Sequence, residues 1–143
     1  PARIVARTLA MMEQPQHIAA GILKNAHAMT DVTGFGLAGH VQAICAASGV
    51  QAEIWRDKVP VYEGARELSD AGVFSSLLAA NTADALTTGL PDPLLHDPQT
   101  AGGLLAALPR DAAETALEAL RDQGCEGHII GALSAGSGPI RVS

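Results

Sequence analysis

Lysine, cysteine and aromatic residues are scarce in this sequence of 143 residues, and each scarcity argues against a class of protein. Aromatic residues make up 3% of the chain, and lysine occurs only at Lys24 and Lys58 within a formal net charge of −6. Nucleic-acid binding as a main function is therefore not expected, because it needs clustered basic side chains and rings that stack on bases. Two cysteines, Cys45 and Cys125, are too few for a disulfide framework or a cysteine zinc site.

Long apolar runs are also missing. The chain has no stretch of 18 apolar residues and no basic start followed by an apolar segment, so it predicts neither a membrane span nor a signal peptide. Together with the few cysteines, this pattern favours a reducing, cytoplasmic location. The sequence begins at Pro1 without an initiator methionine, which suggests a fragment excised from a longer protein.

The composition that is present is typical of one folded domain. Hydrophobic residues make up 48% of the chain and charged residues 17%, which argues against a disordered tail. The length predicts a single domain over residues 1–143 with a core of its own.

Hydrophobic spacing predicts a mixture of helices and strands without strict alternation. Helices are expected over residues 4–12, 18–25, 37–48, 63–71 and 111–123, and strands over 27–32, 50–55, 103–108, 129–133 and 139–142. Asp111 and Glu114 suggest a capping box, Gly49 a left-handed helix end, and residues 135–138 a glycine-rich turn between the last two strands. The sequence therefore predicts an α+β fold, with a mixed β-sheet flanked by helices.

The first candidate site follows the strand at 27–32. Asp31 ends this strand, and Thr33, Gly34 and Gly36 form a turn that leads into a helix. Glycines let the backbone approach a ligand, amides at a helix start attract anions, and a carboxylate is a hard ligand for Mg²⁺. From the pattern alone a purely structural turn, with Asp31 bonded to its own backbone, is the stronger interpretation.

The second candidate site lies before the strand at 103–108. Pro98 and the glycine pair make a constrained loop in which Thr100 and the amides of Gly102 and Gly103 are available to meet a ligand. A simple β-bulge explains the same glycines, and spacing alone favours it.

Histidine and cysteine add no further site. The five histidines, at positions 17, 27, 40, 96 and 128, show no metal-ligand spacing and are interpreted as surface or hydrogen-bonded residues. Cys45 lies on the apolar stripe of the helix at 37–48 and is expected in the core, whereas Cys125 follows Gly124 in a turn.

Both motifs, taken together, resemble one family. Residues 31–37 (Asp-Val-Thr-Gly-Phe-Gly-Leu) and 97–105 (Asp-Pro-Gln-Thr-Ala-Gly-Gly-Leu-Leu) are similar to the C-terminal domain of the selenophosphate synthetases, or selenide, water dikinases. The resemblance extends over nearly the whole chain. It implies the α+β domain shared with aminoimidazole ribonucleotide synthetase and its relatives.

The resemblance also implies an activity. Members of this family convert selenide, ATP and water to selenophosphate, AMP and phosphate with Mg²⁺, and are expected to be homodimers. A preceding domain carries the ATP-binding glycine-rich segment, a reactive cysteine or selenocysteine and a lysine. That domain is absent from residues 1–143, so the fragment alone is expected to be inactive and to contain no catalytic nucleophile.

Motif matching assigns roles within this chain. Asp31 would bind Mg²⁺ at the ATP site, and the accompanying ligand contacts would come from Thr33, Gly34, Gly36, Thr100, Gly102 and Gly103. Two departures from the family pattern are Ala101, where serine is usual, and residues 75–81, where a Gly-Thr-Arg-Asn-like run is usual. Both departures resemble the variant in which the synthetase follows a flavoprotein oxidoreductase domain.

Two other functions remain open. One is a sister ATP-dependent synthetase of the same superfamily, such as a purine-biosynthetic enzyme or a thiamine-phosphate kinase relative. The other is a non-catalytic binding or assembly module, which the missing nucleophile and lysine would suit.

Overall fold

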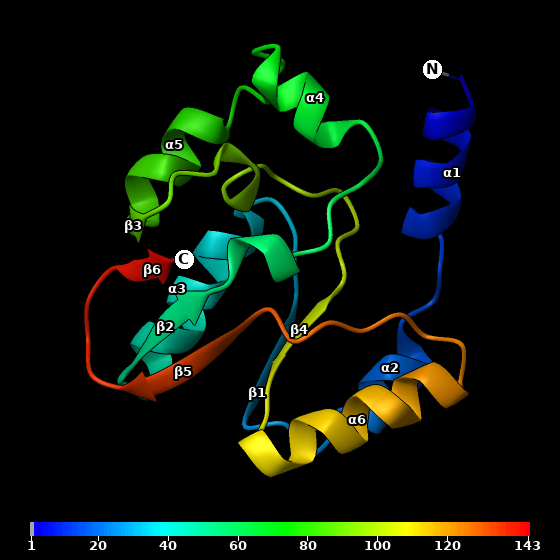
Figure 1. Ribbon diagram of the computed structural model, residues 1–143, viewed down its shortest axis with the longest axis vertical. Helices are drawn as coiled ribbons and strands as arrows, with labels where there is room; N and C mark the ends of the chain where they lie inside the picture. The colour runs from blue at the N-terminus through cyan, green and yellow to red at the C-terminus, as the bar shows by residue number, and fades with distance from the viewer. Residues whose placement is uncertain (1) are drawn as a thin grey trace.

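Helices and short strands alternate irregularly along the chain in the computed structural model, which describes residues 2–143 (Figure 1). The helices are α1 (Ala2–Met12), α2 (His17–Ile22), α3 (Gly36–Ser48), α4 (Ala65–Asp70), α5 (Leu78–Asp84) and α6 (Arg110–Asp122). The strands are β1 (Ala28–Asp31), β2 (Val50–Ile54), β3 (Thr87–Gly89), β4 (Leu104–Ala107), β5 (Gly131–Ala135) and β6 (Ile140–Val142). Two 3₁₀ turns, η1 (Arg56–Lys58) and η2 (Pro93–Leu95), connect longer elements.

The strands form two separate sheets. β3, β6, β2 and β5 lie side by side in that order; β6 is parallel to β3 and β2, and β5 is antiparallel to β2. β1 and β4 form a two-stranded antiparallel ladder, which lies between the larger sheet and the helices α2 and α6 (Figure 1). The predicted α+β fold with a mixed sheet and flanking helices is confirmed.

Helix α3 packs against β2 and supplies much of the core (Figure 1). Ala38, Val41 and Cys45 share one buried cluster with Ile54 of β2, so the predicted core position of Cys45 is confirmed. Removing such apolar surface from water stabilises the fold by about 25 cal/mol for each Å² buried. Gly49 ends the helix with φ 64°, which is the predicted left-handed conformation.

The last two strands are confirmed, but they do not form a hairpin with each other. β5 and β6 lie on opposite sides of β2, so the glycine-rich segment between them crosses the end of β2 instead of making a tight turn. The β2–β6 pairing is parallel, with Glu53 opposite Arg141 and Ile54 opposite Val142. Long-range pairing with a buried central strand therefore replaces the local pairing that a short loop would allow.

Two elements have no counterpart in the sequence prediction. Helix α5 and strand β3 lie within residues 72–89, where the sequence predicts no element. α5 has a single buried residue, Asn81, and thus no apolar stripe to mark it as a helix. β3 has three residues, which are too few for a visible alternation, and it exists because it pairs with the distant β6.

The ends of two predicted helices differ from the structure. α2 ends at Ile22 and the following Leu23 is buried, so the chain turns earlier than the expected end near residues 24–25. Helix α6 has Pro109 at its N-cap and no side-chain cap, so the expected Asp111–Glu114 capping box is wrong. Asp111 lies in the first turn instead, where its negative charge interacts favourably with the helix dipole and stabilises the helix.

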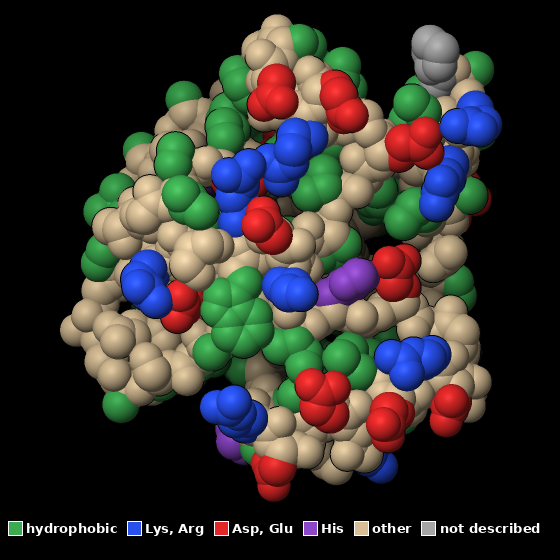
Figure 2. Space-filling view, in the orientation of Figure 1, with side chains coloured by type: hydrophobic (Ala, Val, Ile, Leu, Met, Phe, Trp, Pro, Cys, Tyr) green, Lys and Arg blue, Asp and Glu red, His purple; other side chains and the backbone are tan. Residues whose placement is uncertain are grey.

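Helix α6 is amphipathic and covers the β1–β4 end of the molecule beside α2. Leu120 is buried, whereas the acidic residues Asp111, Glu114, Glu118 and Asp122 are exposed. Acidic side chains are spread over this end of the molecule in Figure 2. Among residues 2–143, no helix has both the length and the apolar character to cross a membrane.

Candidate functional site

Asp31 ends strand β1, opposite Leu104 of β4, and its side chain is exposed. The chain beyond it makes the turn that begins α3, while the chain before Leu104 is the second glycine-rich loop. The antiparallel β1–β4 register therefore brings the two sequence motifs to the same end of one ladder.

Backbone hydrogen bonds continue this ladder into both loops. The Val32 amide donates to the Gly103 carbonyl at 3.0 Å, and the Gly102 amide donates back to the Val32 carbonyl at 3.1 Å. The Gln99 amide donates to the Thr33 carbonyl at 3.1 Å. The structure thus brings the loop of residues 31–36 alongside the loop of residues 97–103.

Two glycines allow this close approach. A Cβ atom on Gly102 would collide with the Val32 carbonyl oxygen, and one on Gly36 would lie 2.8 Å from the His96 carbonyl carbon. Gly36 also has φ 70°, a conformation that L side chains avoid. These glycines are needed for backbone-to-backbone packing between the loops, whether or not a ligand binds.

Three of the amides considered as anion donors are already engaged within the protein. The Thr33 amide donates to Nε2 of His40 at 3.0 Å, the Gly36 amide to the Thr33 carbonyl at 3.0 Å, and the Gly102 amide to Val32. Within the described residues, the amides of Gly34, Thr100 and Gly103 have no protein acceptor, and all three residues are exposed. The donors left for an anion are therefore those of Gly34, Thr100 and Gly103.

His40 and His96 each support one of the two loops. Nε2 of His40 accepts the Thr33 amide, so that nitrogen carries no proton, and the ring makes an edge contact with Phe35. His96 is 4% exposed, and its Nε2 lies 3.4 Å from Oγ1 of Thr87. Burial lowers the pKa of His96, since desolvation disfavours the charged ring. His40 agrees with the interpretation of a hydrogen-bonded histidine, whereas His96 makes such a contact only at Nε2, and its buried Nδ1 has no partner among the described residues.

Asn81 is a residue that the sequence interpretation missed. Its Nδ2 donates to the Gly34 carbonyl and to the His96 carbonyl, at 2.9 Å in both cases. It lies in the segment without a predicted element, so its burial was not visible. The sequence signals are weak: Asn81 is an isolated asparagine on an otherwise apolar and small-residue stretch, and it ends the segment of residues 75–81 that departs from the Gly-Thr-Arg-Asn-like run of the family.

A cavity of about 360 Å³ opens beside the second loop. Its lining includes Leu68, Phe74, Ser75, Leu94, Asp97 and Pro98. Burial raises the pKa of the Asp97 carboxyl group, because desolvation penalises its charged form. The cavity combines apolar walls with one partly desolvated carboxylate, next to the loop that carries Thr100.

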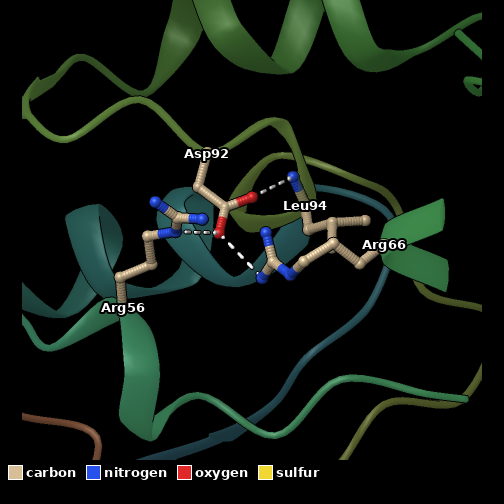
Figure 3. Close-up of polar contacts among 4 residues, drawn as sticks. All are labelled: Arg56, Arg66, Asp92 and Leu94. Carbon is tan, nitrogen blue, oxygen red and sulfur yellow. Dashed lines mark hydrogen bonds and ion pairs between the residues drawn. The ribbon is translucent and has the colours of Figure 1, made fainter. Parts of the chain in front are cut away.

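An ion-pair network fixes the segment that precedes the second loop (Figure 3). The Asp92 side chain is 2% exposed, and its Oδ2 accepts from Nε of Arg56 at 3.2 Å and from Nη2 of Arg66 at 3.0 Å. Its Oδ1 accepts from the Leu94 amide at 3.1 Å. The hydrogen bond to Asp92 raises the pKa of Arg66. The network joins η1, α4 and η2, so it supports the loop without touching it.

The described residues of the site offer one ligand for Mg²⁺ but no complete set of ligands. Within residues 2–143, no three histidine, cysteine, aspartate or glutamate side chains are grouped so as to hold a metal ion. Mg²⁺ needs one or two carboxylates, with phosphate oxygens and waters for the remainder. Asp31, exposed beside the free amides of Gly34 and Gly103, has the chemistry of one such ligand.

Comparison with known proteins gives a consistent result. The family described as "AIR synthase related protein, C-terminal domain" matches residues 4–142. The chain is 36% identical to the selenide, water dikinase of Pseudomonas straminea, over 84% of this chain and 36% of that protein. It is 35% identical to that of Burkholderia pseudomallei, over 99% and 42%, and 44% identical to that of Cronobacter sakazakii, over 65% and 28%.

Solved structures show the same fold. E. coli HypE, described as a hydrogenase maturation protein, superposes with a TM-score of 0.64 at 25% identity, over 89% of this chain and 35% of that one. The chain in a HypE–HypF complex superposes with a TM-score of 0.62 at 24% identity, over 87% and 35%.

The chain spans about two fifths or less of the length of these curated relatives. The family match covers nearly every residue, including both glycine-rich loops and all strands of the two sheets. The chain belongs to the AIR synthase related protein family, as its C-terminal domain.

Proposed function

We propose that this chain is the C-terminal domain of a selenophosphate synthetase and forms one wall of its active site. The observation that carries the proposal is the meeting of two motifs at the end of the β1–β4 ladder, in a chain 35–44% identical to three selenide, water dikinases. In the complete enzyme, a preceding domain would supply the ATP-binding segment, the cysteine or selenocysteine and the lysine.

Asp31 would hold Mg²⁺ at the ATP site. Mg²⁺ neutralises charge on phosphate oxygens when it is bound, which is a main source of catalysis in phosphoryl transfer. The exposed amides of Gly34, Thr100 and Gly103 are oriented by the loop contacts and would donate to phosphate oxygens. Thr33, Gly36 and Gly102 would contribute by shaping the backbone, because their amides are engaged elsewhere.

The overall reaction proposed is the conversion of selenide, ATP and water to selenophosphate, AMP and phosphate. The partners would be ATP and selenide, bound mainly through the preceding domain, and a second copy of the full-length chain in a homodimer. A cytoplasmic location is part of the same proposal. A flavoprotein oxidoreductase domain in the same polypeptide is a further arrangement that Ala101 and residues 75–81 would suit.

The direct test uses the full-length protein that contains this chain. We expect selenide, ATP and Mg²⁺ to yield selenophosphate, AMP and phosphate, measured by phosphorus NMR. Stoichiometric ATP hydrolysis without a phosphorus–selenium product would contradict the proposal and favour a sister synthetase. Neither hydrolysis nor product, in a folded full-length protein, would favour the non-catalytic module.

A further inference from the structure

The amide side chain of Asn81 joins the two loops of the candidate site. Asn81 lies on α5 and is 7% exposed. Its Nδ2 donates one hydrogen bond to the Gly34 carbonyl and another to the His96 carbonyl, each at 2.9 Å. One carbonyl belongs to the turn after Asp31, and the other directly precedes the loop of residues 97–103.

An asparagine is well suited to this position. A side-chain amide has two N–H donors on one nitrogen, so it satisfies two buried carbonyl oxygens at once. A hydroxyl offers one donor, an ionised carboxylate offers none, and an apolar side chain leaves both carbonyls without a side-chain partner. A buried carbonyl that loses its partner destabilises the fold, because nothing compensates for its lost contact with water.

The two loops are also in direct contact through their backbones. Gly36 packs so closely that an added Cβ would lie 2.8–3.0 Å from backbone atoms of His96 and Asp97. Backbone contact thus prevents the loops from moving closer at this point. The two Asn81 hydrogen bonds add to the backbone bonds of Val32 and Thr33 with the second loop in preventing the loops from separating. Their spacing sets the distance between the exposed donors of Gly34 on one loop and of Thr100 and Gly103 on the other.

We infer that Asn81 is a positioning residue, which holds the Asp31 loop and the Thr100–Gly103 loop at the spacing that catalysis requires. The inference rests on the proposed function, since it gives that spacing a role. Asn81 itself touches no proposed ligand; it acts through the carbonyls of Gly34 and His96. A misplacement of about 1 Å in an active site can reduce a rate about a hundredfold.

The test compares three variants of the full-length protein. Asn81→Ala removes both N–H donors. Asn81→Asp keeps the shape of the side chain, but an ionised carboxylate has no donor. Gln42→Ala is the matched control. The side-chain amide of Gln42, on α3, donates to the backbone carbonyl of Asp84, on α5, at 2.9 Å. This bond resembles those of Asn81 but lies away from both loops. Turnover is measured well below the melting temperature of each variant, so that only folded protein is compared.

We expect both Asn81 variants to lose about a hundredfold in kcat with a smaller change in the KM for ATP, because positioning contributes mainly to the transition state. Hydrogen–deuterium exchange at residues 33–36 and 97–103 should rise in both, and remain at the wild-type level in Gln42→Ala. If Asn81 has a purely structural role, its variants should have a lower melting temperature. Their kcat and the exchange in both loops should then stay near those of Gln42→Ala.

The pH profile gives a second readout. In Asn81→Asp, the carboxyl group would face two carbonyl oxygens in a buried position, which raises its pKa. The protonated carboxyl group regains one O–H donor. The kcat of Asn81→Asp relative to the wild type should therefore rise as the pH is lowered from about 8 to about 6. Asn81→Ala cannot regain a donor and should show no such recovery.

Failure of the positioning role and failure of the proposed function give different results. If the wild type makes selenophosphate and both Asn81 variants keep kcat within about twofold of Gln42→Ala, the positioning role is wrong. If the wild type makes none, the proposed function fails, and faster exchange at both loops in the Asn81 variants alone still supports the joining role. Unchanged exchange there overturns it.

Discussion

Asp31 and the loop amides offer the candidate site two different kinds of group, a negative charge and hydrogen-bond donors. Asp31 is exposed and provides negative charge, whereas Gly34, Thr100 and Gly103 provide exposed donors for an anion. The Thr33 amide donates to Nε2 of His40, which restrains the turn within the protein itself. If the proposed function holds, these groups would be oriented in advance, which is how fixed dipoles and charges contribute most to catalysis.

Replacing Asp31 by Asn tests the metal-ligand role. In the full-length enzyme we expect Asp31→Asn to lose at least about a hundredfold in turnover, because an amide brings no negative charge to Mg²⁺. Asn is nearly isosteric and accepts hydrogen bonds, so stability should fall by about 1 kcal/mol or less. Steady-state kinetics and thermal melts measure the two effects.

The control for that variant is Asp122→Asn, which removes another exposed carboxylate, on α6 and remote from the loops. Its turnover should equal that of the wild type. A turnover for Asp31→Asn close to that of Asp122→Asn would refute the metal-ligand assignment. A modest loss in rate with a clear drop in melting temperature would support a purely structural turn instead.

Cys45 is expected to be unreactive in the native protein. It is buried on α3, and burial raises the pKa of its thiol, so the reactive thiolate is rare at neutral pH. A thiol reagent should label the more accessible Cys125 first and Cys45 only on unfolding, as followed by mass spectrometry. Rapid stoichiometric labelling of Cys45 would show that this face of the helix opens readily.

Among the elements, sequence patterns predicted those whose signal is local. Apolar spacing indicated the buried positions of Val41 and Cys45 on α3, and one glycine indicated the left-handed helix end at Gly49, which is confirmed. The buried Ala38 was not part of the predicted stripe, in which Leu37 and Ile44 are only half-buried. Helix α5 and strand β3 were not predictable, because α5 buries only Asn81 and β3 depends on pairing with β6. The same holds for the order of the larger sheet, in which β2 separates β5 from β6.

The site itself was predictable only in part, because some of its features are local in the sequence and others depend on distant residues. Glycines and a carboxylate at a strand end are visible in the sequence, so both loops were identified as candidates. The joining contacts come from distant positions: Asn81, and the Arg56 and Arg66 partners of Asp92. No spacing within one motif indicates which distant side chain will reach it.

The junction between the β1–β4 ladder and the second loop depends on Gly102. We expect Gly102→Ala to destabilise the full-length protein by about 1–3 kcal/mol, because its Cβ would overlap the Val32 carbonyl oxygen and force the loops apart. Gly103→Ala is the matched control, since nothing lies within 4 Å of a Cβ there. Denaturant unfolding measures both, and equal stability of the two variants would show that the contact relaxes without cost.

The whole fold should lose stability in mild acid through His96. Burial lowers the pKa of His96 in the folded state, so between its folded pKa and the usual value of about 6.5 the unfolded chain binds more protons. The stabilisation is therefore complete above about pH 6.5 and is lost progressively as the pH falls from there to the folded pKa. His96→Gln should flatten this part of the stability profile, measured by denaturant unfolding.

His17→Gln is the control for that profile, because His17 is exposed in the folded protein as it is in the unfolded chain. It should keep the wild-type dependence on pH. An acid loss of stability that is identical in His96→Gln and the wild type would mean that His96 is not the group responsible.

Under the proposed function, the molecule as a whole would form one part of a larger enzyme. Its exposed apolar side chains include Val5, Leu68, Val73, Phe74 and Leu77, which lie on α1, α4 and the segment before α5. Its curated relatives are more than twice its length. Asp31 provides one carboxylate, and the sequence contains no phosphate-binding lysine loop. Turnover on this domain alone would thus lack several of the groups that phosphoryl transfer needs.

We therefore expect the 143-residue chain by itself to make no selenophosphate. Purified chain, ATP, Mg²⁺ and selenide would be incubated and followed by phosphorus NMR, with circular dichroism and a cooperative melt to establish that the domain is folded. The reason is positional: a single carboxylate and three free amides stabilise charge only when the other half of the site holds the nucleotide against them. Adding the rest of the full-length protein as a separate chain should restore some product if the two parts associate, and Asp31→Asn in this chain should abolish that restoration. Accumulation of selenophosphate with the isolated chain would mean that residues 1–143 hold a complete catalytic site.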